Sequence, residues 1–398
     1  MAMTSRLFSE WTREDRSPRA MRESIFDYVD RMAGPLWANV RKHLNDWVYR
    51  YPAEHRPELL GRLRSRSDSV DFYAAYWELF LYHLLVRSGY EVVCHPDVPG
   101  TSKKPDFRAS RDGAAVYVEA KLVGDSAAER RRQRERVEVW AELDRRVSSE
   151  HFFVRLGIIE RGHSPLPHRL LAQQAEAWLG RLDVDAVRVA VADGGLRDVD
   201  AFEWRHEKSG WAISLAPIPK TQHHESHRLV GMGEAEGWFP NDRAAFRGAL
   251  ADEGHRYGRS LDAPLIVALS MGRAFVDDFD VINALFGDEV VEVHRETMAT
   301  TMARARNGVW LGPRGPRARG LSGVLVGKSI GPWSLASARL THWANPWASS
   351  PSAISVSCVG TVSAGDDVLD RREAAQSILE WMGLPQGWPE PDDPTAST

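Results

Sequence analysis

The sequence predicts an α/β fold in which a mixed sheet is flanked by helices. A strongly apolar helix is expected over residues 72–85, and a two-stranded hairpin follows within residues 105–122. Residues 127–147 and 170–182 carry helical spacing of apolar side chains, whereas residues 152–160 are expected to form a strand. Helices that alternate with strands are typical of a sheet covered by helices. With 398 residues and 43% hydrophobic content, the chain can bury a large core or form two domains.

Composition and charge exclude several classes of protein. The net charge of -4 shows that the chain is not basic overall, so any contact with nucleic acid must come from local basic patches. The two cysteines, Cys94 and Cys358, provide no disulfide framework and suit a reducing compartment. Residues 1–23 lack an apolar signal segment, and no apolar run is long enough to span a bilayer. We therefore expect a soluble cytoplasmic protein with no membrane partner.

A helical segment is expected over residues 1–66, ahead of the predicted sheet. Apolar residues recur at helical spacing in residues 24–32 and 36–50, and a Gly-Pro pair separates the two runs. A third short helix is expected near residues 57–63. These helices are expected to precede the core and cover its sheet.

The hairpin within residues 105–122 brings two carboxylates together. Asp112-Gly113, flanked by extended residues, is a strong signal for a two-residue turn. Counting back from this turn along both strands places Asp106 directly opposite Glu119. Two facing carboxylates, with side chains roughly 5 Å apart, repel each other and destabilise a hairpin. The simplest group that makes such a pair tolerable is a divalent cation between them.

Two further residues fit the same chemistry. The period of two in a strand places Lys121 on the same face as Glu119. Glu78 lies in the apolar helix, where a carboxylate is costly unless it is paired, hydrogen-bonded or bound to a metal. A Mg²⁺ ion held by carboxylates lowers the pKa of bound water and neutralises charge on a phosphate. A lysine beside it can hold a water or stabilise developing charge, so this set suits phosphodiester hydrolysis.

Glu78 in a helix, Pro105-Asp106 opening a strand and Glu119-x-Lys121 on the next strand together resemble the PD-(D/E)xK phosphodiesterase superfamily, which has the restriction-endonuclease-like fold. The resemblance implies that Asp106 and Glu119 bind Mg²⁺, for which Mn²⁺ can substitute. It implies that Lys121 serves the attacking water and that Glu78 supports the metal or the water. It also implies a nuclease-like core over residues 67–220.

Later parts of the chain look similar to an uncharacterised group of bacterial proteins that carry this core. The stretches concerned are Arg256-Tyr257-Gly258, Ala284-Leu285-Phe286-Gly287, Gly312-Pro313-Arg314-Gly315-Pro316-Arg317 and Asn345-Pro346-Trp347-Ala348. A C-terminal α/β region is expected over residues 221–382, with a role in substrate binding. Residues 383–398 are rich in proline and acidic side chains and are expected to be a disordered tail.

Arginines supply the candidate contacts to nucleic acid. The helix after Lys121 and a later stiff loop provide Arg130, Arg131 and Arg134, and Arg314, Arg317 and Arg319. Such side chains can bind the phosphate backbone. The alternative is a solvated face, which glutamates balance in the helix, and an ordinary surface turn in the loop. Gln133 lies in the same helix, and in branches of the superfamily a glutamine near this point reaches the active site.

The expected function is therefore a Mg²⁺-dependent nuclease, with DNA favoured over RNA and endonuclease over exonuclease activity. Restriction, repair and phage defence are the roles that the family analogy brings. A catalytically inert nucleic-acid-binding or structural module on the same fold is the alternative. A third reading is an unrelated α/β protein in which Asp106 and Glu119 lie far apart. The sequence leaves a homodimer open.

Further strands and one helix complete the expected elements. The strands are expected at residues 90–94, 186–191, 211–218, 264–270 and 322–330, and the helix at residues 281–286. The polar stretch of residues 221–260 is the expected domain boundary, although the later strands could extend the same sheet.

Overall fold

The computed structural model of the chain describes residues 6–20, 22–66, 69–123, 127–195, 199–220, 229, 242–251, 261–271, 277–293, 297–364 and 369–390. The chain forms two compact units. Unit 1 comprises residues 1–19, 23–124 and 241–398, and unit 2 comprises residues 20–22 and 125–240.

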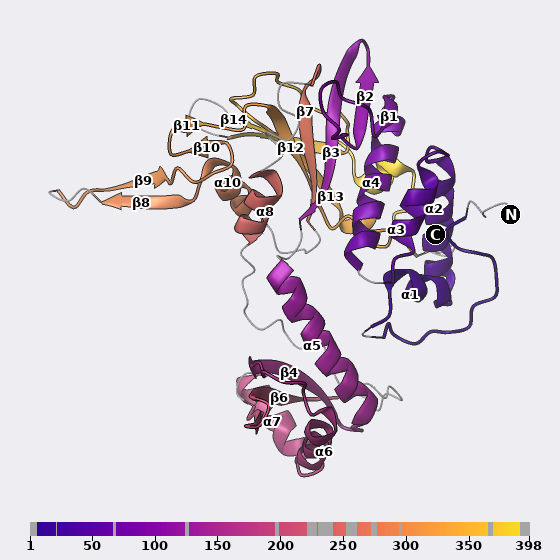
Figure 1. Cartoon of the computed structure of the whole chain (residues 1–398), viewed down its shortest axis with the longest axis vertical. Coiled ribbons are helices and arrows are strands. Elements are labelled where there is room, and N and C mark those ends of the chain that lie inside the picture. The colour runs from indigo at the N-terminus through magenta and orange to yellow at the C-terminus, as the bar shows by residue number, and fades with distance from the viewer. Residues whose placement is uncertain are drawn as a thin grey trace, which may run out of the picture. The chain divides into compact units, whose positions relative to one another are not determined.

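Unit 1 is built on a mixed sheet (Figure 1). In the described part of the chain this sheet has eight strands in the order β1-β2-β3-β7-β12-β13-β14-β15. Parallel pairs join β3 to β7, β7 to β12 and β13 to β14, and the other neighbours are antiparallel. The strands are β1 (Glu91–Cys94), β2 (Phe107–Arg111), β3 (Ala114–Val123), β7 (Leu265–Met271), β12 (Leu321–Lys328), β13 (Arg339–Ala344), β14 (Val359–Ala364) and β15 (Leu369–Arg372).

Helices cover both faces of this sheet. Val116 and Val118 of β3 belong to the apolar cluster that includes α4 (Ser69–Arg87). Tyr117, between them, belongs to a second cluster with α8 (Asp242–Ala251) and α10 (Asp278–Phe286). All seven residues of β7 are buried, as expected for a strand covered on both faces. The expected α/β class, a mixed sheet flanked by helices, is confirmed.

The N-terminal helices pack on the α4 side of the sheet. They are α1 (Ile25–Arg31), α2 (Pro35–Arg50) and α3 (Arg56–Leu63), close to the expected bounds. Their buried residues join those of α4 in one cluster. Pro35 and Pro57 stand near the starts of α2 and α3, where a missing backbone N–H costs nothing.

Smaller elements complete unit 1. The strands β8 (Glu289–Val293) and β9 (Thr300–Arg304) form a hairpin that extends from the sheet, at the left of Figure 1. Within the described residues, unit 1 also has a short hairpin of β10 (Leu311–Gly312) and β11 (Gly315–Pro316), the 3-10 helix η1 (Leu335–Ser337) and the helix α11 (Ile378–Met382).

Unit 2 has a core of its own. Three antiparallel strands lie in the order β4 (Phe152–Glu160), β6 (Trp211–Pro219) and β5 (Phe202–His206). The helices are α5 (Ala127–Arg146), α6 (His168–Leu179) and α7 (Val184–Gly194). Described residues of α5, α6 and α7 share one apolar cluster with the three strands.

The strand expected at residues 186–191 is wrong, because this stretch lies inside α7. The Asp183 side chain accepts hydrogen bonds from the backbone N–H groups of Asp185 and Ala186, which fixes the helix start. Val184, Val187 and Val191 contact the apolar core of unit 2 at helical spacing. Tertiary packing of one face therefore outweighs the β propensity of the valines.

The disordered tail expected over residues 383–398 is wrong for residues 383–390. Trp388 is 6% exposed and packs in the apolar cluster around α4. Its indole N–H donates a hydrogen bond to the carbonyl oxygen of Pro332 at 3.0 Å. Residues 391–398 lie outside the described residues.

The division into units also differs from the expected one. Residues 1–66, 67–123 and the described part of 261–390 belong to a single unit, because β7 and β12 continue the sheet of β1, β2 and β3. Residues 125–240 form the second unit, so the expected core of residues 67–220 combines parts of both. Within the described residues, no helix combines the length and apolar character that crossing a membrane requires.

Candidate functional site

The turn between β2 and β3 sets the geometry of the site. Asp112 and Gly113 have φ angles of 53° and 77°, and both angles are positive, as the favoured two-residue hairpin turn requires. Pairing runs back from this turn to Phe107 opposite Val118. The register expected from the sequence is therefore confirmed.

Asp106 directly precedes β2, and continuing the register by one residue sets it against Glu119, whose charge acts on it. Asp106 Oδ2 accepts a hydrogen bond from the backbone N–H of Ala120 at 2.7 Å, which ties the two strands together at this point. On its other side, the carbonyl oxygen of Asp106 accepts from the backbone N–H of His95 at 2.8 Å. This bond continues the β1–β2 pairing by one residue. His95 directly follows β1, Asp106 directly precedes β2 and Glu119 lies in β3, so extending the pairing of these strands by one residue sets the three in a row.

The carboxylates near Asp106 affect its protonation. Burial, followed by the charges of Glu119 and Glu78, raises the pKa of Asp106 to about 8. The hydrogen bond from Ala120 opposes this shift. Lys121 Nζ lies 3.6 Å from Oε1 of Glu119, and its side chain is 31% exposed. The lysine therefore pairs with one carboxylate of the row and still reaches solvent.

Glu78 is buried in α4 and has two strong hydrogen-bond donors. The helix is apolar around its whole circumference, and the Glu78 side chain is only 4% exposed. The hydroxyl of Tyr51 donates to Oε1 at 2.6 Å. The guanidinium of Arg62 pairs with Oε2, and its Nε lies 2.8 Å from Oε1 of Glu58. Arg62 therefore joins Glu58 and Glu78 and compensates the buried charge.

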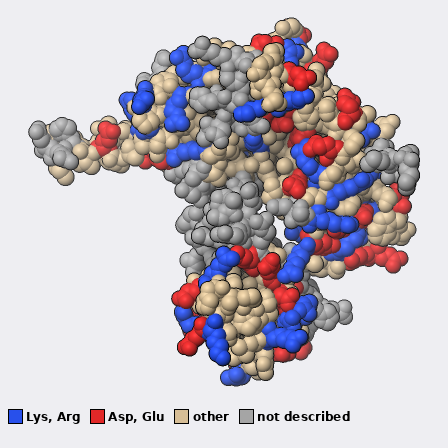
Figure 2. Space-filling view, in the orientation of Figure 1, with Lys and Arg blue, Asp and Glu red and all other residues tan. Residues whose placement is uncertain are grey.

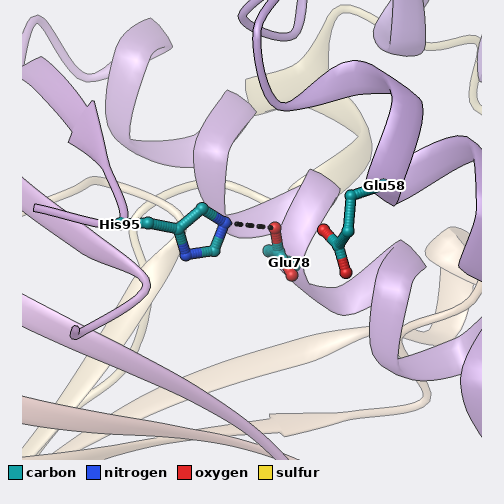
Figure 3. A group of neighbouring side chains, drawn as sticks. All are labelled: Glu58, Glu78 and His95. Carbon is teal, nitrogen blue, oxygen red and sulfur yellow. Dashed lines mark ion pairs between the residues drawn. The ribbon is translucent and has the colours of Figure 1, made fainter. Parts of the chain in front are cut away.

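His95 faces Glu78 (Figure 3) and also lies near Asp106, and the sequence-based prediction did not include it. Its Nε2 is 3.7 Å from Oε1 of Glu78, and its Nδ1 is 3.9 Å from Oδ1 of Asp106. His95 has a φ of 46°, which is uncommon for a residue other than glycine. Burial lowers the pKa of His95, against the opposite effect of Glu78. The ligand atoms of Glu58, Glu78 and His95 all lie within 4.8 Å of one another.

The loop arginines lie away from this row of residues. Arg314, Arg317 and Arg319 are exposed; Arg314 lies in the turn between β10 and β11, and the other two follow β11. Nε of Arg319 donates to the carbonyl oxygen of Trp347 at 3.3 Å. Blue side chains lie over the part of the surface in Figure 2 where Figure 1 places this hairpin.

The expected contacts from α5 cannot be placed in the same way. Residues 127–146 form the helix that was expected there. The side chains of Gln133, Arg130, Arg131 and Arg134 lie outside the described residues.

Unit 2 contains a separate open pocket of about 380 Å³. Glu135 and Arg161 line it and form an ion pair. His163 and Trp211 also line it, and the Trp211 indole N–H donates to the carbonyl oxygen of Ser164 at 2.8 Å. The lining offers charges of both signs and selects no ligand class.

Comparisons with known proteins return no match to this chain, whether with family models, with curated proteins or with solved structures.

Proposed function

We propose that this protein is a metal-dependent nuclease on a restriction-endonuclease-like core, with DNA as the favoured substrate. The observation that supports the proposal is the placement of Asp106 opposite Glu119, with Lys121 two residues further along the same strand. Glu78 lies on the neighbouring helix, as the resemblance to the PD-(D/E)xK superfamily implies. These residues come from three elements that lie together in unit 1.

The residues present fit a divalent cation. Two carboxylates face each other, and the pKa of Asp106 is raised by burial and by Glu119. A cation between them would remove this repulsion, and carboxylate oxygens are the ligands that Mg²⁺ and Mn²⁺ accept. Asp106 and Glu119 would hold the ion, whereas the charge of Glu78 is already balanced by the Arg62 guanidinium.

The roles of the protein side chains follow from their positions. A bound cation supplies charge neutralisation at the scissile phosphate and lowers the pKa of a bound water. The Lys121 amine can donate to that water or to a phosphate oxygen, because its side chain reaches solvent beside Glu119. Ala120 holds Asp106 in place through its backbone N–H. Arg314, Arg317 and Arg319 are candidate contacts to the nucleic-acid backbone.

A specific observation favours the alternative of an inert module on the same fold. Glu119 is paired with Lys121, and Glu78 is paired with Arg62. Carboxylates that are paired in this way need no metal. The two proposals differ in whether the protein binds a divalent cation and cleaves nucleic acid.

The test is nuclease activity on plasmid DNA, linear duplex DNA, single-stranded DNA and RNA in the presence of Mg²⁺ or Mn²⁺. We expect Asp106→Ala and Lys121→Ala to reduce cutting on the order of 10²-fold or more. Asp97→Ala and Lys103→Ala are matched controls, because both side chains are exposed on the loop between β1 and β2, and they should cut like the wild type. Metal-dependent cutting that survives in Asp106→Ala and Lys121→Ala would overturn the assignment of this site.

A further inference from the structure

The two ring nitrogens of His95 face two different carboxylates. Nδ1 faces Asp106 at 3.9 Å, and Nε2 faces Glu78 at 3.7 Å. Both separations are too long for a hydrogen bond. The imidazole is therefore placed between the buried carboxylate of α4 and the row of Asp106 and Glu119, without a close bond to either side chain.

The separation between His95 and Asp106 suits two ligands of one ion. Nitrogen and oxygen ligands lie about 2.1 Å from a small divalent cation. With these bond lengths, two ligand atoms lie about 3 Å apart when their bonds to the metal form a right angle. They lie about 4.2 Å apart when they are on opposite sides of the metal. The distance of 3.9 Å between Nδ1 of His95 and Oδ1 of Asp106 lies within this interval.

A separate ion among Glu58, Glu78 and His95 is less well supported, although their ligand atoms lie close together. The guanidinium of Arg62 pairs with both Glu58 and Glu78. This guanidinium already supplies the positive charge that a cation between the two carboxylates would bring. We therefore assign no ion to that group.

We infer that the cation held by Asp106 and Glu119 also binds Nδ1 of His95, while Glu78 orients the imidazole from its Nε2 side. This inference rests on the proposed function and deepens it. Glu78 is then a positioning residue rather than a metal ligand. Tyr51 and Arg62 hold Glu78 in place, and a carboxylate behind a ligating histidine fixes its tautomer and orientation.

A histidine ligand would change which metal the site prefers. An imidazole nitrogen in the ligand set favours Mn²⁺ and other transition metals over Mg²⁺, which prefers oxygen ligands. The uncommon φ of 46° at His95 is a backbone strain of the kind that persists where the surrounding structure holds a functional side chain in place. The site is thus expected to select Mn²⁺ over Mg²⁺.

The experiment measures metal binding without any substrate. Mn²⁺ is titrated into the full-length protein and followed by electron paramagnetic resonance, and Mg²⁺ is used as competitor. Electron spin-echo modulation of the bound Mn²⁺ then reports a directly coordinated ¹⁴N. We expect this nitrogen signal in the wild type and its loss in His95→Asn, because asparagine tolerates a positive φ but offers no imidazole. The Kd for Mn²⁺ should rise about tenfold or more in His95→Asn, and by a similar factor in Glu78→Gln.

His55→Asn is the matched control. The His55 ring packs against that of His95 with ring centroids 5.0 Å apart, yet the structure pairs it with no carboxylate of the row. This variant should keep both the nitrogen signal and the affinity. Mn²⁺ that binds the wild type and is lost in Asp106→Asn, but shows no ¹⁴N coupling, would overturn the role of His95 and leave the proposed metal site intact. Absence of Mn²⁺ binding by the wild type would overturn both.

Discussion

Replacing Asp106 with asparagine should stabilise the metal-free protein at neutral pH, although it removes a residue of the proposed active site. Asp106 faces Glu119 across the hairpin, and its pKa is raised by burial and by that neighbour. Asparagine has nearly the same shape, carries no charge and can still accept the hydrogen bond that Ala120 donates. Replacing a carboxylate that forms an ion pair would instead be expected to destabilise the protein.

The magnitude follows from the distance between facing side chains. With both groups ionised, two unit charges about 5 Å apart would repel by about 0.8 kcal/mol in water and by about 3 kcal/mol at an effective dielectric constant of 20, and the folded protein avoids this repulsion only by keeping Asp106 protonated, which itself costs free energy at neutral pH. The Asp106 side chain is 21% exposed and that of Glu119 is 5% exposed, so the repulsion is screened only in part. Lys121 offsets some of it from 3.6 Å. We expect the free energy of unfolding to rise by ~1–3 kcal/mol in Asp106→Asn.

The gain in the free energy of unfolding of Asp106→Asn over the wild type should grow as the pH rises. The pKa of Asp106 is raised from its usual value of 3.8 to about 8 in the folded protein. Folding therefore favours the protonated acid. The free energy of unfolding of the wild type is not reduced by Asp106 below about pH 4, and this reduction grows as the pH rises from about 4 to about 8. The advantage of Asp106→Asn should vanish near pH 4 and be largest near pH 8.

Equilibrium urea unfolding between pH 4 and pH 8, without metal, measures this difference. Asp97→Asn is the control, because the Asp97 side chain is 91% exposed, and it should change stability by less than about 0.5 kcal/mol. Added Mn²⁺ should reverse the order of wild type and Asp106→Asn, because only the wild type gains from binding to the native state. An Asp106→Asn variant that is less stable than the wild type at pH 7 would refute the reasoning.

Three further predictions concern the rest of unit 1, each checked by urea unfolding. Trp388→Ala should destabilise the protein by ~3–5 kcal/mol because Trp388 is 6% exposed, and a change below ~1 kcal/mol would indicate a loose tail after all. Gly113→Ala should cost ~1–2 kcal/mol because of its φ of 77°, whereas Gly61→Ala inside α3 meets no atom within 4 Å and should stabilise by up to ~1 kcal/mol. Burial lowers the pKa of His43 to about 3 and that of His342 to about 4. Between about pH 6.5 and pH 4 these histidines therefore take up a proton only in the unfolded chain. Each should lower the free energy of unfolding by up to about 1.4 kcal/mol for every unit by which the pH falls. A stability that stays level over this range would contradict the burial of these neutral imidazoles.

The pairing of Asp106 with Glu119 could be predicted because it depends on a short range of the chain. Asp112 and Gly113 specify a two-residue turn, and a turn of known length fixes every pair in the two strands. His95 stands in the same row but could not be found in this way. The loop between β1 and β2 contains no such turn, so only the packed sheet sets that register. The sequence signal for His95 was limited to its position directly after a predicted strand.

The functional reading of Glu78 depended on less local information. Its burial was predictable, because a helix that is apolar on every face has to be covered. The partners that compensate its charge come from α2 and α3, since Tyr51 directly follows α2 and Arg62 lies within α3. Helix spacing predicts that such helices exist but not which of their side chains meet. From the sequence alone, the buried acid Glu78 suggests a metal ligand. In the structure, its carboxylate is paired with Tyr51 and Arg62.

The second half of the chain is part of the site, because β3 has neighbours on both sides. Glu119 lies between the β2 strand of Asp106 and the β7 strand, where Val267 is its partner in the parallel register. The residue next to Glu78, Trp77, donates its indole N–H to the carbonyl oxygen of Ala268 at 3.0 Å. Without β7, the backbone of β3 would become an unpaired edge, and the N–H of Trp77 would lose its buried acceptor. A fragment of residues 67–220 therefore lacks the strand that holds both Glu119 and the Glu78 helix, and the two halves of unit 1 have to fold together for the carboxylates to face each other.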